Sequence, residues 1–449
     1  MNRTTPQQVP RKGIWSWMLF DWASQPFHTL ILTFVFAPYF TSQVASSDVV
    51  GQTYWGYAVG IAGLIIALLS PVLGALADAT GPRKPWIFGF SLLGVLGSLG
   101  LWWILPNASD SMLIWGLVAF GIALIGFEFA AVFNNAMMPD LVPREELGKL
   151  SGSSWALGYV GGLFCLVLIL GFMVADPESG KTLLGGSPLF GLDPATHEGD
   201  RASGPLTAIW LALFIIPLFL FTPDQPKRAQ ALGAVKRSLE SLWSTIRNLP
   251  KNQSLLNFLM SSMLYRDALN GLYAFGGIYA AGVLQWSIVQ IGIFGILANV
   301  TGAIGAWIGG RMDARFGPKP VVRACILLLI LASVLVVSTD PEHVLWIALP
   351  SGSNLPDLLF YACGALIGAA GGALQAASRT LMVDQAEPEK MTEAFGLYAL
   401  SGRATSFIAP IAIAATTTLF ASQRIGVTPV IVLFIISLVL LPKVRSRIG

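Results

Sequence analysis

The sequence predicts an all-α integral membrane protein with twelve transmembrane helices in two pseudo-symmetric six-helix bundles. Three observations carry this prediction: the chain is 54% hydrophobic and only 11% charged, apolar blocks recur along all 449 residues, and the two halves repeat the same short motifs. Soluble domains usually carry about 25% charged residues, so much of this surface must face lipid. A helix needs about 20 predominantly apolar residues to cross a bilayer, and the apolar blocks are of that length.

The expected spans fall into two sets of six. Those of the first half are 14–41, 52–76, 86–105, 112–138, 151–175 and 205–222. Those of the second half are 255–282, 288–310, 320–338, 357–383, 393–420 and 425–442. We therefore expect an N-terminal bundle over 1–222, a linker over 223–253 and a C-terminal bundle over 254–449.

Lys and Arg residues predict the orientation, because cytoplasmic loops of membrane proteins carry an excess of them. With the N-terminus inside, most basic residues outside the spans fall in expected inner segments, whereas the outer segments hold only Lys181, Arg201 and Arg424. Both termini are therefore expected in the cytoplasm. The outer loop over 176–204 is rich in Gly, Pro and acidic residues, which is typical of an irregular solvated loop, although a role in screening substrates is an alternative.

The basic linker contains a candidate amphipathic helix. Helical spacing relates its apolar residues Val235, Leu239, Leu242 and Ile246. This pattern favours a helix lying on the membrane surface between the two bundles, and a plain linker fits the same residues.

Four short motifs of the first half recur in the second half in the same order. They are Phe20-Asp21 with Arg266-Asp267, Gly74–Lys84 with Gly309–Lys319, Asp140 with Asp384, and Trp155-Ala156-Leu157 with Tyr398-Ala399-Leu400. An internal repeat of this kind indicates two related bundles with a substrate site between them, near the middle of the membrane.

The segment Gly74–Lys84 (GALADATGPRK) resembles the inner-loop signature of the major facilitator superfamily. The segments Phe20–Ser24, Trp155–Tyr159 and Phe395–Gly402 are similar to the "unknown major facilitator" family, which is related to the fungal vacuole effluxers. The resemblance covers the whole chain and implies the major facilitator fold, transport by alternating access, and a central cavity lined by spans one, four, seven and ten. The fungal relatives are linked to the release of amino acids from the vacuole.

Charged residues at the inner ends of the spans form a candidate cytoplasmic latch. A carboxylate at Asp78 can cap the start of a neighbouring helix, and Arg83 can pair with Asp140. The resemblance implies that such contacts close the inner side while the outer side is open, whereas the alternative is that the basic residues only fix topology. The candidate set is Asp78, Arg83, Lys84 and Asp140 in the first half, and Asp313, Arg315, Lys319 and Asp384 in the second.

Polar and ionisable side chains within the expected spans are candidates for binding substrate or protons, because a charge in the bilayer core is costly. At a rise of about 1.5 Å per residue, His28, Glu128 and Arg266 lie near the middle of a core about 30 Å thick, and Asp21 and Arg379 lie nearer the cytoplasm. The candidate set is Asp21, His28, Glu128, Arg266, Asp267, Asn270, Arg379 and Arg403.

These candidates also have structural interpretations. Glu128 suits a proton site, because burial and an adjacent arginine act in opposite directions on its protonation, yet Glu128 with Arg266 could be an ion pair that only fixes packing. Asp21 and Arg379 could form an inner gate. His28 titrates in the range of a pH switch, but a single histidine in a helix is as often a hydrogen-bonded packing residue.

We expect a secondary active transporter for a small polar solute, with proton coupling as a further hypothesis. Charges of both signs suit a zwitterion such as an amino acid or a small peptide, and an organic anion held by Arg266 and Arg379 is the alternative. A non-transporting receptor or scaffold on the same fold stays open. An integral membrane enzyme is disfavoured, because the chain contains no G-x-S-x-G motif, no H-E-x-x-H motif and no Cys/His cluster.

No catalytic residue, cofactor or metal site is predicted. The three cysteines, Cys165, Cys325 and Cys363, lie in apolar blocks without metal-binding spacing. The net charge of +3 gives no indication of nucleic-acid binding. We expect a monomer, with the lipid bilayer and a small-molecule substrate as its partners, in a bacterial cytoplasmic (inner) membrane.

Overall fold

The structure, a computed structural model, describes residues 9–228, 234–286, 288–350, 352–406 and 408–446, and most of them are helical. Contacts divide the chain into two compact units, one of Met1–Val142 with Leu157–Leu232 and one of Pro143–Ala156 with Gly233–Gly449. Helix α6 (Leu147–Phe172) is shared between them, since its first part belongs to the second unit and its remainder, from Leu157, to the first.

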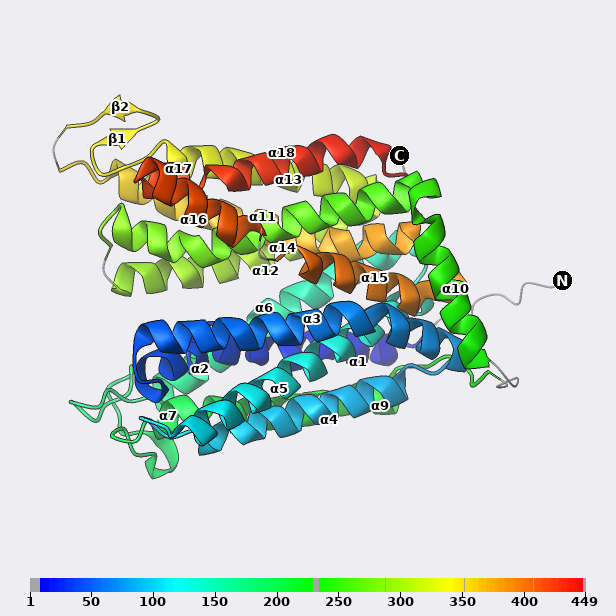
Figure 1. Ribbon diagram of the computed structural model, residues 1–449, viewed down its shortest axis with the longest axis horizontal. Helices are drawn as coiled ribbons and strands as arrows, with labels where there is room; N and C mark the ends of the chain where they lie inside the picture. The colour runs from blue at the N-terminus through cyan, green and yellow to red at the C-terminus, as the bar shows by residue number, and fades with distance from the viewer. Residues whose placement is uncertain (1–8, 229–233, 287, 351, 407, 447–449) are drawn as a thin grey trace. The chain divides into compact units, whose positions relative to one another are not determined.

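The first unit contains the helices of the first half of the chain (Figure 1). Besides its part of α6, they are α1 (Arg11–Pro26), α2 (Phe36–Tyr39), α3 (Asp48–Thr80), α4 (Lys84–Gly100), α5 (Asp110–Met137), α7 (Glu198–Arg201), α8 (Ser203–Phe214) and α9 (Ile216–Phe221). Small residues let α4 and α5 approach closely, because a Cβ added at Gly97 or Gly126 would meet the backbone of the other helix.

The second unit contains the remaining elements (Figure 1). Its helices are α10 (Ala234–Asn248), α11 (Gln253–Gly282), α12 (Ile288–Phe316), α13 (Pro318–Val337), α14 (Leu355–Gln385), α15 (Met391–Ala404), α16 (Ile408–Phe420), α17 (Gln423–Gly426) and α18 (Thr428–Leu440). The linker helix α10 runs across the direction of α11 (Figure 1). Glycines again permit close packing, since a Cβ at Gly372 of α14 would meet the backbone of Gly302 on α12.

A two-stranded hairpin follows α13, where the sequence predicts no strand. Strand β1 (His343–Val344) pairs antiparallel with β2 (Ile347–Ala348). The two residues of the turn, Leu345 and Trp346, have positive φ angles of 52° and 59°, as a type I′ hairpin turn requires. The hairpin lies beyond the end of α13 (Figure 1) and contains the only named strands of the described residues.

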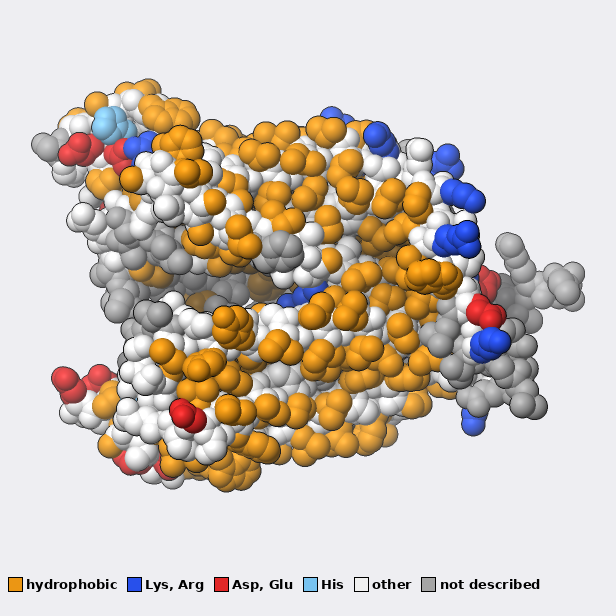
Figure 2. Space-filling model, in the orientation of Figure 1, with side chains coloured by type: hydrophobic (Ala, Val, Ile, Leu, Met, Phe, Trp, Pro, Cys, Tyr) orange, Lys and Arg blue, Asp and Glu red, His pale blue; other side chains and the backbone are white. Residues whose placement is uncertain are grey.

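Ten helices of the described residues are long and apolar enough to cross a membrane. Two further helical stretches fill the places expected for spans one and seven: Arg11–Val44, which is interrupted, and the 30-residue α11, which carries several polar side chains. The predicted count of twelve is consistent with this arrangement. Hydrophobic side chains cover the visible flank of each unit, as a lipid-facing surface requires (Figure 2).

Several spans expected to be continuous are interrupted, among them the sixth, which divides into α8 and α9, and the first and the eleventh. The first changes from α1 to a π-helix at Phe27–Phe34, directly after Pro26, because proline cannot donate the hydrogen bond that a regular helix needs. A second π-helix, Phe40–Val44, follows α2. The eleventh span, predicted as one helix over 393–420, consists of α15 and α16 with a break after Ala404.

Candidate functional site

Arg83 organises a charged cluster in the first unit. Its Nη1 lies 2.6 Å from Oδ2 of Asp140, and its Nη2 lies 3.5 Å from Oδ1 of Asp78. Arg228 donates to the backbone oxygen of Asp78 at 2.7 Å, and Lys84 donates through Nζ to the oxygen of Phe219 at 3.1 Å. Because Arg83 is only 5% exposed, its two carboxylate partners compensate a nearly buried charge.

Asp224 caps helix α4, a role that the sequence did not reveal. Its Oδ1 accepts from the backbone N–H of Arg83 at 2.9 Å, and its Oδ2 accepts from that of Lys84 at 2.9 Å. The amides at the start of a helix lack partners within the helix, and the positive end of the helix dipole favours a carboxylate there. A residue from the expected linker therefore supplies the cap that the sequence predicts for Asp78.

The corresponding residues of the second unit pair differently from the expected pattern. Asp384 forms an ion pair with Arg144, not with Arg315 or Lys319. Lys319 donates to the backbone oxygens of Pro442 and Val444 at 3.0 and 2.7 Å, and the guanidinium of Arg315 lies over the ring of its neighbour Phe316. The repeat of the motif therefore does not extend to a repeat of its ion pairs.

The first part of α6 packs closely on α12 within the second unit. A Cβ added at Gly148 would meet the side chain of Asp313, which is 2% exposed, and one added at Gly152 would meet the backbone of Gly310. Glycines at one-turn spacing permit this close approach of two helices. Asp313 is thus part of a packed helix crossing.

Arg379 lies in the same contact. Its Nη2 donates to the oxygen of Ser151 at 2.8 Å, its Nε donates to Oγ of Ser151 at 3.1 Å, and its guanidinium lies 4.6 Å from the ring of Trp155. With 2% of its surface exposed, Arg379 is enclosed by protein. This environment favours the gate interpretation of Arg379 over direct contact with substrate.

Arg266 and Asp267 hold the two sides of the break in the eleventh span. Arg266 donates to the oxygen of Tyr398 on α15 at 3.0 Å and lies 4.3 Å from its ring. Asp267 accepts at Oδ2 from the backbone N–H of Ala409, the second residue of α16, at 3.0 Å. Arg403 is half-buried near the end of α15, whereas Asn270 is exposed on α11.

The candidates of the first unit are half-buried. Asp21 lies on α1 opposite Gly158 of α6. A Cβ added at Gly158 would lie 3.4 Å from the Cβ of Asp21. The ring of His28 packs edge-on against that of Phe27, which follows Pro26 at the start of the π-helix. Glu128 lies on α5, in the first unit, whereas Arg266 lies in the second. Asp21, His28 and Glu128 all have interaction partners.

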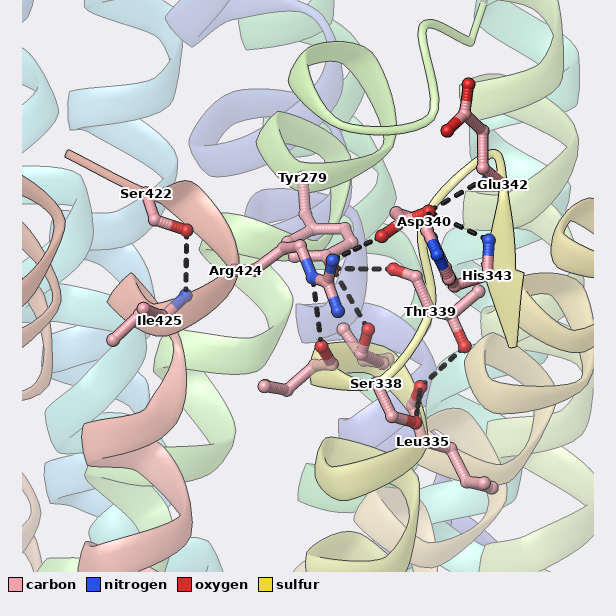
Figure 3. A network of polar contacts seen from close by, with 12 residues as sticks. Tyr279, Leu335, Ser338, Thr339, Asp340, Glu342, His343, Ser422, Arg424 and Ile425 are labelled. Atoms are coloured by element: carbon pink, nitrogen blue, oxygen red, sulfur yellow. Dashed lines mark hydrogen bonds and ion pairs between the residues drawn. The ribbon is translucent and has the colours of Figure 1, made fainter. Parts of the chain in front are cut away.

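A cluster that the sequence did not predict lies at the end of α13, where four side chains join four segments of the second unit (Figure 3). Asp340 forms an ion pair with Arg424 of α17 and lies 3.0 Å from Nδ1 of His343. Arg424 also donates to the oxygen of Val337 at 3.2 Å. The hydroxyl of Tyr279 on α11 donates to the backbone oxygen of Thr339 at 3.0 Å. We call Tyr279, Asp340, His343 and Arg424 the Arg424 cluster.

The first unit contains a similar set. Arg201 donates to the oxygen of Trp102, at the end of the third expected span, at 2.8 Å. Tyr39 donates to the oxygen of Ile104 at 2.7 Å, and Nδ1 of His197 lies 3.0 Å from Oδ2 of Asp200. We call Tyr39, His197, Asp200 and Arg201 the Arg201 cluster. In each cluster a tyrosine and an arginine donate to backbone oxygens at the end of one helix. This helix is the third expected span in the first unit and α13, its counterpart in the repeat, in the second. No sequence motif relates the two clusters.

Comparison with known proteins identifies the family. A family model described as "Vacuole effluxer Atg22 like" matches residues 51–447. The chain is 25% identical over 453 residues to the "Uncharacterized MFS-type transporter YxiO" of Bacillus subtilis (strain 168), a match that covers 100% of this chain and 96% of that protein. It is 24% identical over 310 residues to "Autophagy-related protein 22" of Cryptococcus neoformans var. neoformans serotype D (strain JEC21 / ATCC MYA-565), covering 67% of this chain and 51% of that protein, about half its length.

Solved structures show the same fold. The transporter FucP of the major facilitator superfamily, in an outward conformation, has a TM-score of 0.73 at 13% identity, covering 97% of this chain and 99% of that one. The human organic anion transporter MFSD10 (TETRAN) has a TM-score of 0.66 at 18% identity, covering 97% and 100%. The fold is therefore shared with transporters of the major facilitator superfamily, and the chain belongs to the vacuole effluxer Atg22-like family.

Proposed function

We propose that this transporter moves a small polar solute, with an amino acid or a small peptide as the first candidate, by alternating access. The supporting observation is that apolar spans carry half-buried charges of both signs: Asp21 and Glu128 in the first unit, and Arg266 and Arg403 in the second. An ionisable side chain within a membrane span is a candidate for function even where it has a partner. A zwitterion offers both signs to such a set.

An organic anion is the second candidate. The guanidinium of Arg266 donates through Nη1 to one backbone oxygen, that of Tyr398, and rests on an aromatic ring, so the group keeps further N–H donors. Arginine binds carboxylates through two parallel hydrogen bonds, which suits an acid substrate. The solved neighbour MFSD10 is named as an organic anion transporter, which is consistent with this candidate.

We propose that the direction of transport is efflux, because the matching family model is described as that of a vacuole effluxer. We further propose that both termini are cytoplasmic in a bacterial cytoplasmic membrane, because basic side chains gather at the end of the second unit that carries the end of α18 (Figure 2).

The latch residues fit a role in alternating access. Arg83 has two carboxylate partners in the first unit, and Arg144 pairs with Asp384 in the second. Helix α6 belongs to both units, so a change in the contacts of Pro143–Ala156 would be transmitted along one continuous helix. We propose that this helix connects the inner contacts of the second unit to the first.

The proposal is tested by transport into proteoliposomes that contain the purified chain. Labelled amino acids, dipeptides and organic acids are each measured by counterflow, and then with an imposed proton gradient. We expect uptake of one class, loss of uptake in R266Q, and normal uptake in R311Q. Arg311 is a matched control because its side chain is exposed and donates to Trp307 on its own helix. Absence of flux for every class under every gradient would favour a receptor or scaffold.

A further inference from the structure

The break in the eleventh span depends on one carboxyl group from another helix. Helix α16 starts at Ile408, and the N–H of Ala409 has Oδ2 of Asp267 as its acceptor at 3.0 Å. Amides at the start of a helix need acceptors from outside the helix, and a carboxylate is favoured there by the helix dipole. Asp267 of α11 therefore caps α16.

The second oxygen of this carboxyl is unusual. Asp267 is 3% exposed, and its Oδ1 has no hydrogen-bond partner among the described residues. One turn further along α11, Gly271 lies against Ala409, Ile413 and Val430, so the surroundings on that side are apolar. Buried polar atoms nearly always have a partner, and each exception needs an explanation. A carboxylate oxygen can only accept, so the missing partner is a proton donor or a proton itself.

The charged groups on helices packed against α11 have other partners. Arg266 donates to Tyr398, Arg379 to Ser151, and Arg424 pairs with Asp340. The helices α12, α14 and α15, which also contact α11, carry further charged residues, among them Asp313, Asp384, Glu393 and Arg403. Asp384 pairs with Arg144, and Glu393 and Arg403 have interactions of their own. Helices α16 and α18 contain no titratable side chain. Among the described residues, no cation donates to Asp267.

We propose that Asp267 is the proton-binding carboxyl of this transporter and that its protonation loosens the start of α16. In the charged form, the carboxylate caps α16 and is stabilised by the positive end of that helix. A proton that arrives from water binds Oδ1, removes the charge and weakens the cap, and the same proton returns to water when the cap reforms. No other reactant is needed.

Asp267 is a better proton site than Glu128, the first candidate from the sequence. Glu128 is half-buried and has an interaction partner, whereas Asp267 is enclosed and has one oxygen without a hydrogen-bond partner among the described residues. The cap also provides a physical link between the proton and the backbone of the eleventh span. The inference rests on the proposed transport function only for its biological consequence.

The test needs no substrate. Hydrogen exchange by mass spectrometry is followed over residues 408–412 of the full chain in detergent or nanodiscs, across a pH series and after correction for the intrinsic exchange rate. We expect exchange to rise by about fivefold as the pH falls through the titration, the factor that corresponds to loss of one helix cap. In D267N, which keeps an acceptor oxygen but cannot titrate, we expect the same residues to exchange at a pH-independent rate.

Two further measurements keep the test decisive. In E128Q, a matched change of the other candidate carboxyl, we expect the wild-type pH dependence. Infrared difference spectra of wild type and D267N should show a protonated carboxyl band that titrates in the first and is missing in the second, even if D267N is less stable. A pH-independent wild type, a titrating D267N, or loss of the dependence in E128Q would overturn the proposal. A negative result in the hydrogen-exchange test would not contradict the proposed transport function. Absence of transport in proteoliposomes would not contradict the titration of Asp267.

Discussion

Replacing Arg424 by glutamine should open the end of the second unit without unfolding it. The change removes the ion pair with Asp340 (Figure 3) and the hydrogen bond to the oxygen of Val337. Removing one partner of a fully buried ion pair costs about 3–5 kcal/mol. Asp340 keeps Nδ1 of His343 at 3.0 Å and two backbone N–H donors at 2.9 Å, so its charge is not left alone. We therefore expect a cost of about 2 kcal/mol, the value of a hydrogen bond to a charged group.

The cysteines offer a reporter for each unit. Cys363 is 2% exposed and lines a small apolar pocket together with Tyr279 and Val336, directly next to the Arg424 cluster. Cys165 of the first unit is fully buried in a hydrophobic group that includes Ala202, the neighbour of Arg201. Alkylation of a buried thiol requires local opening, so a loss of about 2 kcal/mol should raise the rate at Cys363 about 30-fold.

The reciprocal change provides the control. We expect R424Q to accelerate alkylation of Cys363 and to leave Cys165 unchanged, and we expect R201Q to do the reverse. Mass spectrometry of the peptides that contain each cysteine measures both rates in one sample. If either substitution accelerates both cysteines equally, the clusters do not act within their own units. If neither rate changes, the two clusters do not hold the helix ends, and the reasoning is wrong.

The Arg424 cluster also predicts a pH dependence. Burial raises the pKa of Asp340, but hydrogen bonds from His343 and the backbone, with the charge of Arg424, outweigh it and hold the pKa below its ordinary value. A carboxyl with a lowered pKa contributes stability above its unfolded value of about 3.9, and that contribution is lost as the pH falls through the folded value. Protection of Cys363 should therefore be constant at neutral and mildly acidic pH and fall only in strong acid, and D340N should abolish this acid response.

Three further substitutions test other contacts. D224A removes the carboxylate that caps α4, so we expect exchange of its first-turn amides to rise about fivefold or more, from loss of about 1 kcal/mol or more. G152V forces a side chain onto the backbone of Gly310, and we expect a loss of about 1–3 kcal/mol of stability in detergent, whereas G56A, which faces open space, should behave as wild type. D78N weakens the charged cluster around Arg83, so the maximal transport rate should fall more than the apparent substrate affinity; the opposite pattern would argue against a latch.

The fold was predictable because each membrane span can be recognised from its own residues, without reference to the other spans. Apolar length alone locates most helices, and the duplicated motifs relate the two halves. The breaks were harder to predict. Pro26 signals the change in the first span, since proline disturbs a helix in a known way. Residues 405–406 give no such signal, because threonine and serine occur in many continuous membrane helices. The break there depends on Arg266 and Asp267, which approach from another part of the chain.

The residue types of the candidate site could be predicted, but most of their pairs could not; the ion pair of Arg83 with Asp140 is the exception. An ionisable residue in an apolar span, such as Arg266, Asp267 or Arg379, can be recognised from sequence. Their partners are backbone oxygens or amides far away in the chain, and every residue carries those groups. For the same reason the Arg201 and Arg424 clusters were missed. Their arginines bind the carbonyls at a helix end, a position that leaves no trace in composition or spacing.

Two aspartates perform the same task in this protein, and the difference between them separates structure from function. Asp224 caps α4 and uses both carboxylate oxygens, so it needs no further partner and explains itself as a structural element. Asp267 caps α16 with one oxygen only, although it is the more deeply enclosed of the two. An unsatisfied buried oxygen destabilises the fold. Among the described residues, Oδ1 of Asp267 has no hydrogen-bond partner, and our proposal assigns that position to a proton.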